Sequence, residues 1–257
     1  KLKQIDKKKL YNFLRDMEFN RLLSSVISTY GEIDFNDEKK IFTQNKSEKI
    51  SKKNYILIKN ENEVNELIFQ IEELTEISID TETSSLDPHQ ADLIGISISP
   101  KVGVSYYIPL NHKNYKNLNE KNVLKKLENI LVDKSIKKIG QNIKFDYIIF
   151  YRRGIDLEPL EDTMLMSYVL DAGKNRHNMD TLSEIHLGHK TISYKDIVGT
   201  GKKQINFSEV NVEDAKNYAA EDADITLRLY KKFLINLKNE KLMNIYESFE
   251  KPLIKIL

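Results

Sequence analysis

The chain has 257 residues, of which 40% are hydrophobic and 31% are charged, so it can form one large or two small domains with a sizeable core. It contains no cysteine, which excludes disulfides and thiolate metal sites and fits a reducing cytosol. Its net charge of +1 argues against a protein that coats duplex nucleic acid, but it allows a nucleic-acid enzyme with an acidic, metal-binding cleft.

The first 53 residues differ in composition from the rest of the chain. Residues 5–28 carry apolar side chains at helical spacing, which predicts one or two short helices. Residues 31–53 are polar and rich in Lys, Asn and Glu, which is typical of a linker. We therefore predict a helical N-terminal extension with a linker over residues 1–53, and a compact domain that begins near Asn54.

No apolar run approaches the ~20 residues that span a bilayer, and no signal-peptide pattern opens the chain, so we expect no membrane partner. Because the chain begins with Lys1 rather than Met, we expect a fragment of a longer protein.

The remaining sequence carries most of its strand patterns first, including a hairpin, and then mostly helix patterns. The predicted strands cover residues 55–59, 77–81, 92–100, 103–110 and 136–140. The predicted helices cover residues 61–74, 120–132, 143–153, 161–171, 179–187 and 212–238. The third and fourth strands are joined by a tight turn and predict a hairpin. Strands that come first and helices that follow predict an α/β fold with a mixed sheet flanked by helices.

Asp80 and Glu82 lie at the end of the apolar strand "ISIDT" and its continuation. Side chains at i and i+2 of a strand point to the same face, so the two carboxylates project together from the carboxyl end of this strand. Two like charges this close repel each other unless a cation lies between them, and Mg²⁺ or Mn²⁺ prefers such oxygen ligands. The alternative is that both acids simply face water.

Two further segments carry acids on predicted helices. Asp146 falls in the first turns of a helix that follows "GQN", where an acid commonly interacts with the helix dipole. Tyr218 and Asp222 in "YAAEDADIT" are spaced i, i+4 and so share one helix face, a spacing that ordinary packing also uses. Glu221 and Asp224 point elsewhere and are expected to meet solvent or a basic neighbour.

The three segments together resemble a known family. "DTETSSLD", "GQNIKFD" and "YAAEDADIT" are similar to the three exonuclease motifs of the DEDD superfamily, in its tyrosine-bearing branch. The resemblance is to the proofreading 3′–5′ exonuclease domain of bacterial DNA polymerase I, and it runs from about Tyr55 to the C-terminus. It implies a ribonuclease H-like fold, an exonuclease domain over residues 54–240 and the start of a polymerase module over residues 241–257.

The resemblance also implies a mechanism with two divalent metal ions, Mg²⁺ or Mn²⁺. Asp80, Glu82 and Asp222 would hold one ion, and Asp80 with Asp146 would hold the second. Tyr218 would orient the attacking water, because a tyrosine with a pKa near ~10 is a poor general base at neutral pH. The expected product is a nucleoside 5′-monophosphate released from a single-stranded or frayed DNA 3′ end.

The same resemblance assigns roles in substrate binding to five residues. Leu86 would wedge against the terminal bases, Tyr194 would stack on one base, Gln141 and Asn142 would contact the end nucleotide, and Arg176 would contact a phosphate. Each residue also has a purely structural alternative. Leu86 could pack within a turn, and Tyr194 could be a core aromatic. Gln141 and Asn142 could cap the start of a helix, and Arg176 could be a solvated charge. The expected partners are a DNA 3′ end and the polymerase module of the parent chain, with the domain acting as a cytoplasmic monomer.

Two other functions are kept as alternatives. An RNA 3′ exonuclease of the ribonuclease D type shares the four acids, although the polymerase-like tail argues against it. A catalytically silent structural domain of a polymerase would have lost the acids, which are intact here. His186 and His189, at i, i+3, have no evident third ligand for zinc, so we expect them to have surface or packing roles.

Overall fold

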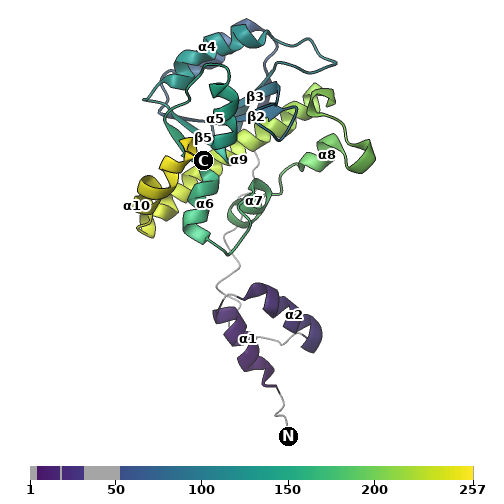
Figure 1. Cartoon of the computed structure of the whole chain (residues 1–257), viewed down its shortest axis with the longest axis vertical. Coiled ribbons are helices and arrows are strands. Elements are labelled where there is room, and N and C mark those ends of the chain that lie inside the picture. The colour runs from purple at the N-terminus through teal and green to yellow at the C-terminus, as the bar shows by residue number, and fades with distance from the viewer. Residues whose placement is uncertain (1–4, 18, 32–52, 257) are drawn as a thin grey trace. The chain divides into compact units, whose positions relative to one another are not determined.

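The computed structural model describes residues 5–17, 19–31 and 53–256, and the chain divides into two compact units, Lys1–Ser47 and Glu48–Leu257 (Figure 1). The first unit contains α1 (Lys7–Asp16) and α2 (Asn20–Tyr30), which confirms the predicted short helices. The Tyr11 hydroxyl donates to the Gly31 carbonyl at 2.6 Å and so ties α1 to the end of α2. The predicted linker lies outside the described residues except for its ends, Gly31 and Lys53.

The second unit is built on one mixed, six-stranded sheet. Its strands are β1 (Asn54–Leu57), β2 (Glu76–Thr83), β3 (Leu93–Lys101), β4 (Val104–Pro109), β5 (Lys137–Gly140) and β6 (Leu160–Asp162), in the spatial order β1-β4-β3-β2-β5-β6. β3 runs antiparallel to both β2 and β4, and the remaining neighbours are parallel. The mixed sheet and the β3–β4 hairpin therefore confirm the prediction.

Helices cover both faces of this sheet (Figure 1). They are α3 (Glu61–Ile71), α4 (Glu120–Val132), α5 (Ile143–Tyr151), α6 (Thr163–Asp171), α7 (Met179–Leu187), α8 (Tyr194–Val198), α9 (Val212–Asn239) and α10 (Met243–Ile245). The apolar faces of α3, α4 and α5 pack with one face of β2 and β3 in a single buried cluster. The long helix α9 crosses the other face and packs against β1 to β5. Among the described residues, no helix is both long and apolar enough to cross a membrane.

The short elements near the ends of β5 and α7 differ from the prediction. Residues 160–162 form the edge strand β6 rather than the start of a helix, because they pair in parallel with β5 and α6 begins only at Thr163. The five-residue helix α8 lies in a segment where no helix was predicted. After α10 the chain continues in helical turns over Tyr246–Glu250 and Lys251–Lys255, and Tyr246 is fully buried against α6 and α9.

Candidate active site

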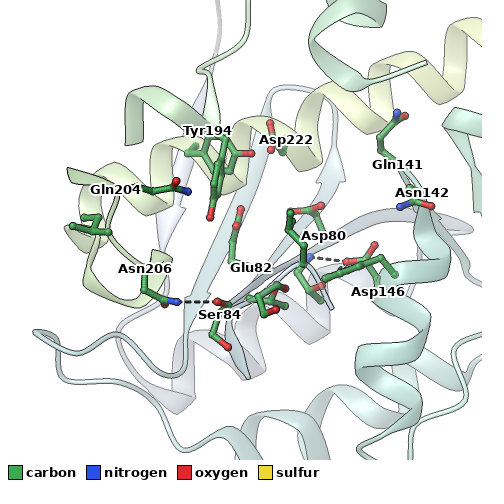
Figure 2. Close-up of a pocket in the computed structure, with 17 residues that line it drawn as sticks. Asp80, Glu82, Ser84, Gln141, Asn142, Asp146, Tyr194, Gln204, Asn206 and Asp222 are labelled. Atoms are coloured by element: carbon green, nitrogen blue, oxygen red, sulfur yellow. Dashed lines mark hydrogen bonds between the residues drawn. The ribbon is translucent and has the colours of Figure 1, made fainter. Parts of the chain in front are cut away.

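Strand β2 aims two carboxylates at helix α9. Ser78, Asp80 and Glu82 alternate with the buried Ile77 and Ile79, so they share one face of the sheet. The Ser78 hydroxyl donates to the Ala223 carbonyl of α9 at 2.5 Å, which shows that this face lies directly against the helix. Figure 2 shows the Asp80 and Glu82 side chains pointing into one cleft beneath α9.

Helix α9 supplies the third carboxylate of this cluster. Ala219, Ala220 and Ala223 are fully buried, and such small side chains let the helix approach the sheet closely. One carboxylate oxygen from each of Asp80, Glu82 and Asp222 lies within 4.8 Å of the other two. An oxygen-only set this close is what a hard divalent cation requires, so these residues fit a metal ion.

Helix α5 brings Asp146 to the same cleft from the other face of the sheet. Its Oδ1 accepts hydrogen bonds from the Thr81 backbone N–H at 2.9 Å and from the Thr81 hydroxyl at 2.6 Å. Thr81 lies between the two β2 acids and points to the opposite face, so it joins the α5 acid to the strand. Asp146 lines the cleft but is outside the cluster of three.

Burial and mutual repulsion shift the acidity of all four groups. Burial raises the pKa of Asp80 to about 6. It also raises the pKa of Glu82, Asp146 and Asp222 well above their usual range, and the nearby Asp80 charge adds to the shift in each case. Bonds from Thr81 partly offset the rise at Asp146. Ionising all four acids therefore costs free energy in the absence of a cation, and nearby positive charge would stabilise the ionised forms.

Tyr218 stands beside Asp222, one helical turn earlier on α9. Burial raises the pKa of its hydroxyl, and the charges of Asp222, Glu82 and Asp80 raise it further. In the metal-free cleft these effects favour the protonated hydroxyl, which is suited to hydrogen bonding.

The acids line a cleft of about 500 Å³ (Figure 2). Four of the five predicted substrate-binding residues, Leu86, Gln141, Asn142 and Tyr194, also line it, whereas Arg176 is exposed and lies outside the lining. Leu86 is 92% exposed and free to touch a ligand. Tyr194 packs parallel to Phe207, with ring centroids 6.3 Å apart.

Several lining residues were not identified from the sequence. Gln204, Ile205 and Asn206 enter the cleft from the segment after α8, and the Asn206 amide donates to the Ser84 carbonyl at 2.8 Å. This bond joins the segment to the loop that follows β2. Nothing in the spacing of these residues marks them, because the contact spans 122 positions of the chain.

The two other acids of the α9 motif are buried rather than solvated. Glu221 forms an ion pair with Lys53 and accepts from His189 at 3.0 Å. Asp224 is fully buried and accepts from Arg228 at 3.0 Å. The expectation of a basic neighbour is therefore confirmed for both acids, and the expectation of solvent exposure is wrong.

The two histidines, for which we expected surface or packing roles, both contact other side chains of the fold. His186 meets the Phe233 ring edge-on at 4.8 Å, and His189 contacts Glu221. Within the described part of the chain, the one cluster of metal-ligating side chains is the three carboxylates, and it contains no histidine.

A mixed sheet whose acids converge from a central strand and two helices is the arrangement of a nuclease of the ribonuclease H-like class. Residues 55–238 match the family model described as 3′–5′ exonuclease. DNA polymerase I of Rhizobium leguminosarum is 41% identical over 202 residues, covering 70% of this chain and 20% of the relative. DNA polymerase I of Borreliella burgdorferi is 40% identical over 196 residues, covering 76% and 21%.

The chain therefore belongs to the 3′–5′ exonuclease domain family of DNA polymerase I, as the sequence motifs predicted, and it spans about a fifth of the length of these relatives. Among solved structures, Escherichia coli RNase D has a TM-score of 0.63 at 17% identity, over 79% of this chain and 50% of that one. Brucella melitensis NrnC has a TM-score of 0.59 at 23% identity, over 79% and 89%. Both confirm the ribonuclease H-like fold.

Proposed function

We propose that the domain hydrolyses the terminal phosphodiester of a single-stranded or frayed DNA 3′ end and releases a nucleoside 5′-monophosphate. The observation that carries this proposal is the convergence of Asp80, Glu82 and Asp222 within 4.8 Å, in a cleft that also holds Asp146 and Tyr218. The family membership supports the polarity of the reaction, from 3′ to 5′.

The proposed cofactors are two divalent ions, Mg²⁺ or Mn²⁺. Asp80, Glu82 and Asp222 would hold one ion, and Asp80 with Asp146 would hold the other. When bound, such ions supply Lewis acidity that activates a water and neutralises phosphate charge. Among the described residues that line the cleft there is no lysine or arginine, so bound cations would offset the repulsion between these acids and a phosphate.

The protein's own groups orient the reactants. The Tyr218 hydroxyl, which is hydrogen-bonded to the Asp222 side chain, would orient the attacking water by a hydrogen bond and hold it in line with the scissile bond. The water oxygen bonds to phosphorus as the bond to the 3′ oxygen breaks. The water proton passes to solvent, and the departing 3′ oxygen takes up a proton. No covalent enzyme intermediate forms.

The rim of the cleft suits an unpaired strand end. Leu86 and Tyr194 would offer apolar and aromatic surface to the terminal bases, and Gln141 and Asn142, which line the same cleft, would contact the end nucleotide. Arg176, on the surface outside the cleft, would contact a phosphate further along the strand. A paired end must first unstack at a cost of a few kcal/mol, so mismatched ends are better substrates.

The test is digestion of a labelled single-stranded oligonucleotide, with DNA and RNA of the same sequence compared in Mg²⁺, Mn²⁺ and EDTA. We expect metal-dependent shortening of DNA from the 3′ end, abolished in Asp80→Ala. Tyr218→Phe should lower kcat by about 10²-fold while its metal requirement is unchanged. Asp92→Asn, an exposed carboxylate outside the cleft, is the matched control.

Each outcome separates the alternatives. A strong preference for RNA would favour the ribonuclease D type of activity, and no digestion of either strand would favour a silent structural domain. Undiminished activity in Asp80→Ala would refute the metal assignment. Because the relatives are several times longer DNA polymerases, we also propose that the domain works as a monomer beside a polymerase module of its parent chain.

A further inference from the structure

Asp162 is a buried carboxylate outside the catalytic cluster, and two of its hydrogen bonds hold the start of the helix that carries Asp146. It is the N-cap of α6, where its Oδ1 accepts from Met164 N–H at 2.8 Å and Leu165 N–H at 3.4 Å. The side chain also reaches the start of α5, where Oδ1 accepts from Asn142 N–H at 3.1 Å and Oδ2 accepts from Ile143 N–H at 3.0 Å. One carboxylate thus caps two helices.

Helix α5 has no cap of its own. Its N-cap residue, Asn142, has φ of 60° and ψ of 47° and makes no side-chain capping bond. The first N–H groups of a helix have no partner within the helix, and Asp162 supplies partners for two of those at the start of α5. The parallel pairing of Gly140 with Asp162 brings the two chain segments together.

Proposed functional residues lie both before and after the first residue of α5. Asp146 is the fourth residue of α5, and Gln141 and Asn142 form the turn before it (Figure 2). Gln141 is held as well, because its side-chain oxygen accepts from the Thr163 hydroxyl at 2.5 Å. The position of the α5 start therefore sets where one proposed metal ligand and two proposed substrate contacts lie.

We propose that Asp162 is a positioning residue for the exonuclease site, which sets the place of Asp146 and of the Gln141–Asn142 turn by capping α5 from a neighbouring strand. It touches neither substrate nor metal. The inference rests on the proposed function for its effect on catalysis, but its effect on metal affinity is separately measurable. Loss of a partner that orients a metal ligand typically lowers affinity about 10- to 100-fold.

The two carboxylate oxygens allow a selective variant. In Asp162→Asn, the side-chain oxygen in the place of Oδ1 keeps the bonds to Asn142, Met164 and Leu165. The side-chain NH₂ group then takes the place of Oδ2. Because NH₂ is a donor, it cannot accept the hydrogen bond from the Ile143 N–H. This variant keeps α6 capped and breaks the bond to the first residue of α5, whereas Asp162→Ala breaks both caps.

The matched control is Asn60→Ala. Asn60 caps α3 through bonds from Asn62 N–H and Glu63 N–H, both at 3.1 Å, and α3 carries no residue of the site. The control loses a helix cap of similar kind, so it reports what lost stability alone does to activity.

The experiment measures Mn²⁺ affinity by calorimetry, the Mn²⁺ dependence of digestion, and amide hydrogen exchange of the 257-residue chain. We expect Asp162→Asn to weaken Mn²⁺ binding about tenfold or more, to keep most of kcat at saturating Mn²⁺, and to speed exchange at Ile143. Asn60→Ala should bind Mn²⁺ as the unmodified chain does. Asp162→Ala should weaken Mn²⁺ binding and speed amide exchange more than Asp162→Asn does.

The inference is overturned if Asp162→Asn retains unchanged Mn²⁺ affinity and unchanged exchange at Ile143. Should the variants fail to fold, the unmodified chain still decides: fast exchange at Asn142 and Ile143 would show that neither N–H has a partner. If the unmodified chain binds Mn²⁺ but digests no strand, the proposed function fails while the positioning role remains testable by affinity.

Discussion

The acids that are proposed to be needed for activity should destabilise the metal-free fold. The pKa of Asp80 is raised by burial from 3.8 to about 6, and ionised Asp80 raises the pKa of the other three acids. A shift of one unit corresponds to 1.36 kcal/mol, so keeping Asp80 ionised at pH 8 destabilises the metal-free fold by about 3 kcal/mol. Asp80→Asn removes that charge with little change of shape.

We therefore expect Asp80→Asn to be more stable than the unmodified chain in EDTA at pH 8. For a domain of this size, about 3 kcal/mol corresponds to a rise in Tm of about 6 to 12 °C. A raised carboxylate pKa destabilises the fold fully above the folded-state value, and this effect fades as the pH falls from that value to the unfolded-state value of 3.8. The difference between the two proteins should thus stay nearly constant from pH 8 to about pH 6 and shrink between about pH 6 and about pH 4.

The assay is thermal and urea unfolding in EDTA and in saturating Mn²⁺. Mn²⁺ at about 100 times its Kd should stabilise the unmodified chain by about 2.7 kcal/mol and should stabilise Asp80→Asn much less. Asp92→Asn, which is exposed, should not raise the Tm. The reasoning is refuted if Asp80→Asn is the less stable protein in EDTA at pH 8, or if its advantage does not depend on pH.

Three further substitutions test the packing that supports the site. Gly95→Ala should destabilise the fold by about 1–3 kcal/mol, because a Cβ there would lie 2.2 Å from the hydroxyl of the fully buried Tyr107. Lys138→Met should lower the free energy of unfolding by about 1–3 kcal/mol, because the buried ammonium donates to three backbone carbonyls. Thr81→Val should weaken Mn²⁺ binding or activity at least about tenfold, because Asp146 loses its hydroxyl donor.

Each of these predictions has a matched control in urea unfolding or digestion assays. Gly95→Ala combined with Tyr107→Ala should show strong non-additivity, and simple addition would contradict the proposed clash. Lys134→Met, at an exposed lysine, should leave stability unchanged. Thr226→Val removes a buried hydroxyl that has no hydrogen-bond partner, so unlike Thr81→Val it should leave Mn²⁺ binding intact.

Regular elements were predicted well where their periodicity is long. The helices over residues 120–132 and 179–187 have the predicted bounds, and α9 ends one residue beyond its prediction. The pairs Asp80–Glu82 and Tyr218–Asp222 each share a face, because that relation depends only on the repeat of a strand or a helix. Local geometry and residue types were sufficient for these conclusions.

Short or polar segments were not predictable in the same way. β6 is three residues long and contains two acids, and it is a strand only because β5 offers it a pairing edge. Nothing in the sequence distinguishes Lys138 from the other lysines, yet its buried ammonium donates to three backbone carbonyls. In each case a partner from another segment supplies the stabilising free energy.

The sequence by itself determined the family, the long regular elements and which acids are available. Only the tertiary structure decided that β2, α5 and α9 bring those acids to one cleft, that Glu221 and Asp224 are buried on basic partners, and that Asp162 caps two helices. The reason is physical. Periodicity reports the face on which a side chain lies, whereas burial and hydrogen bonding depend on what the fold places opposite that face.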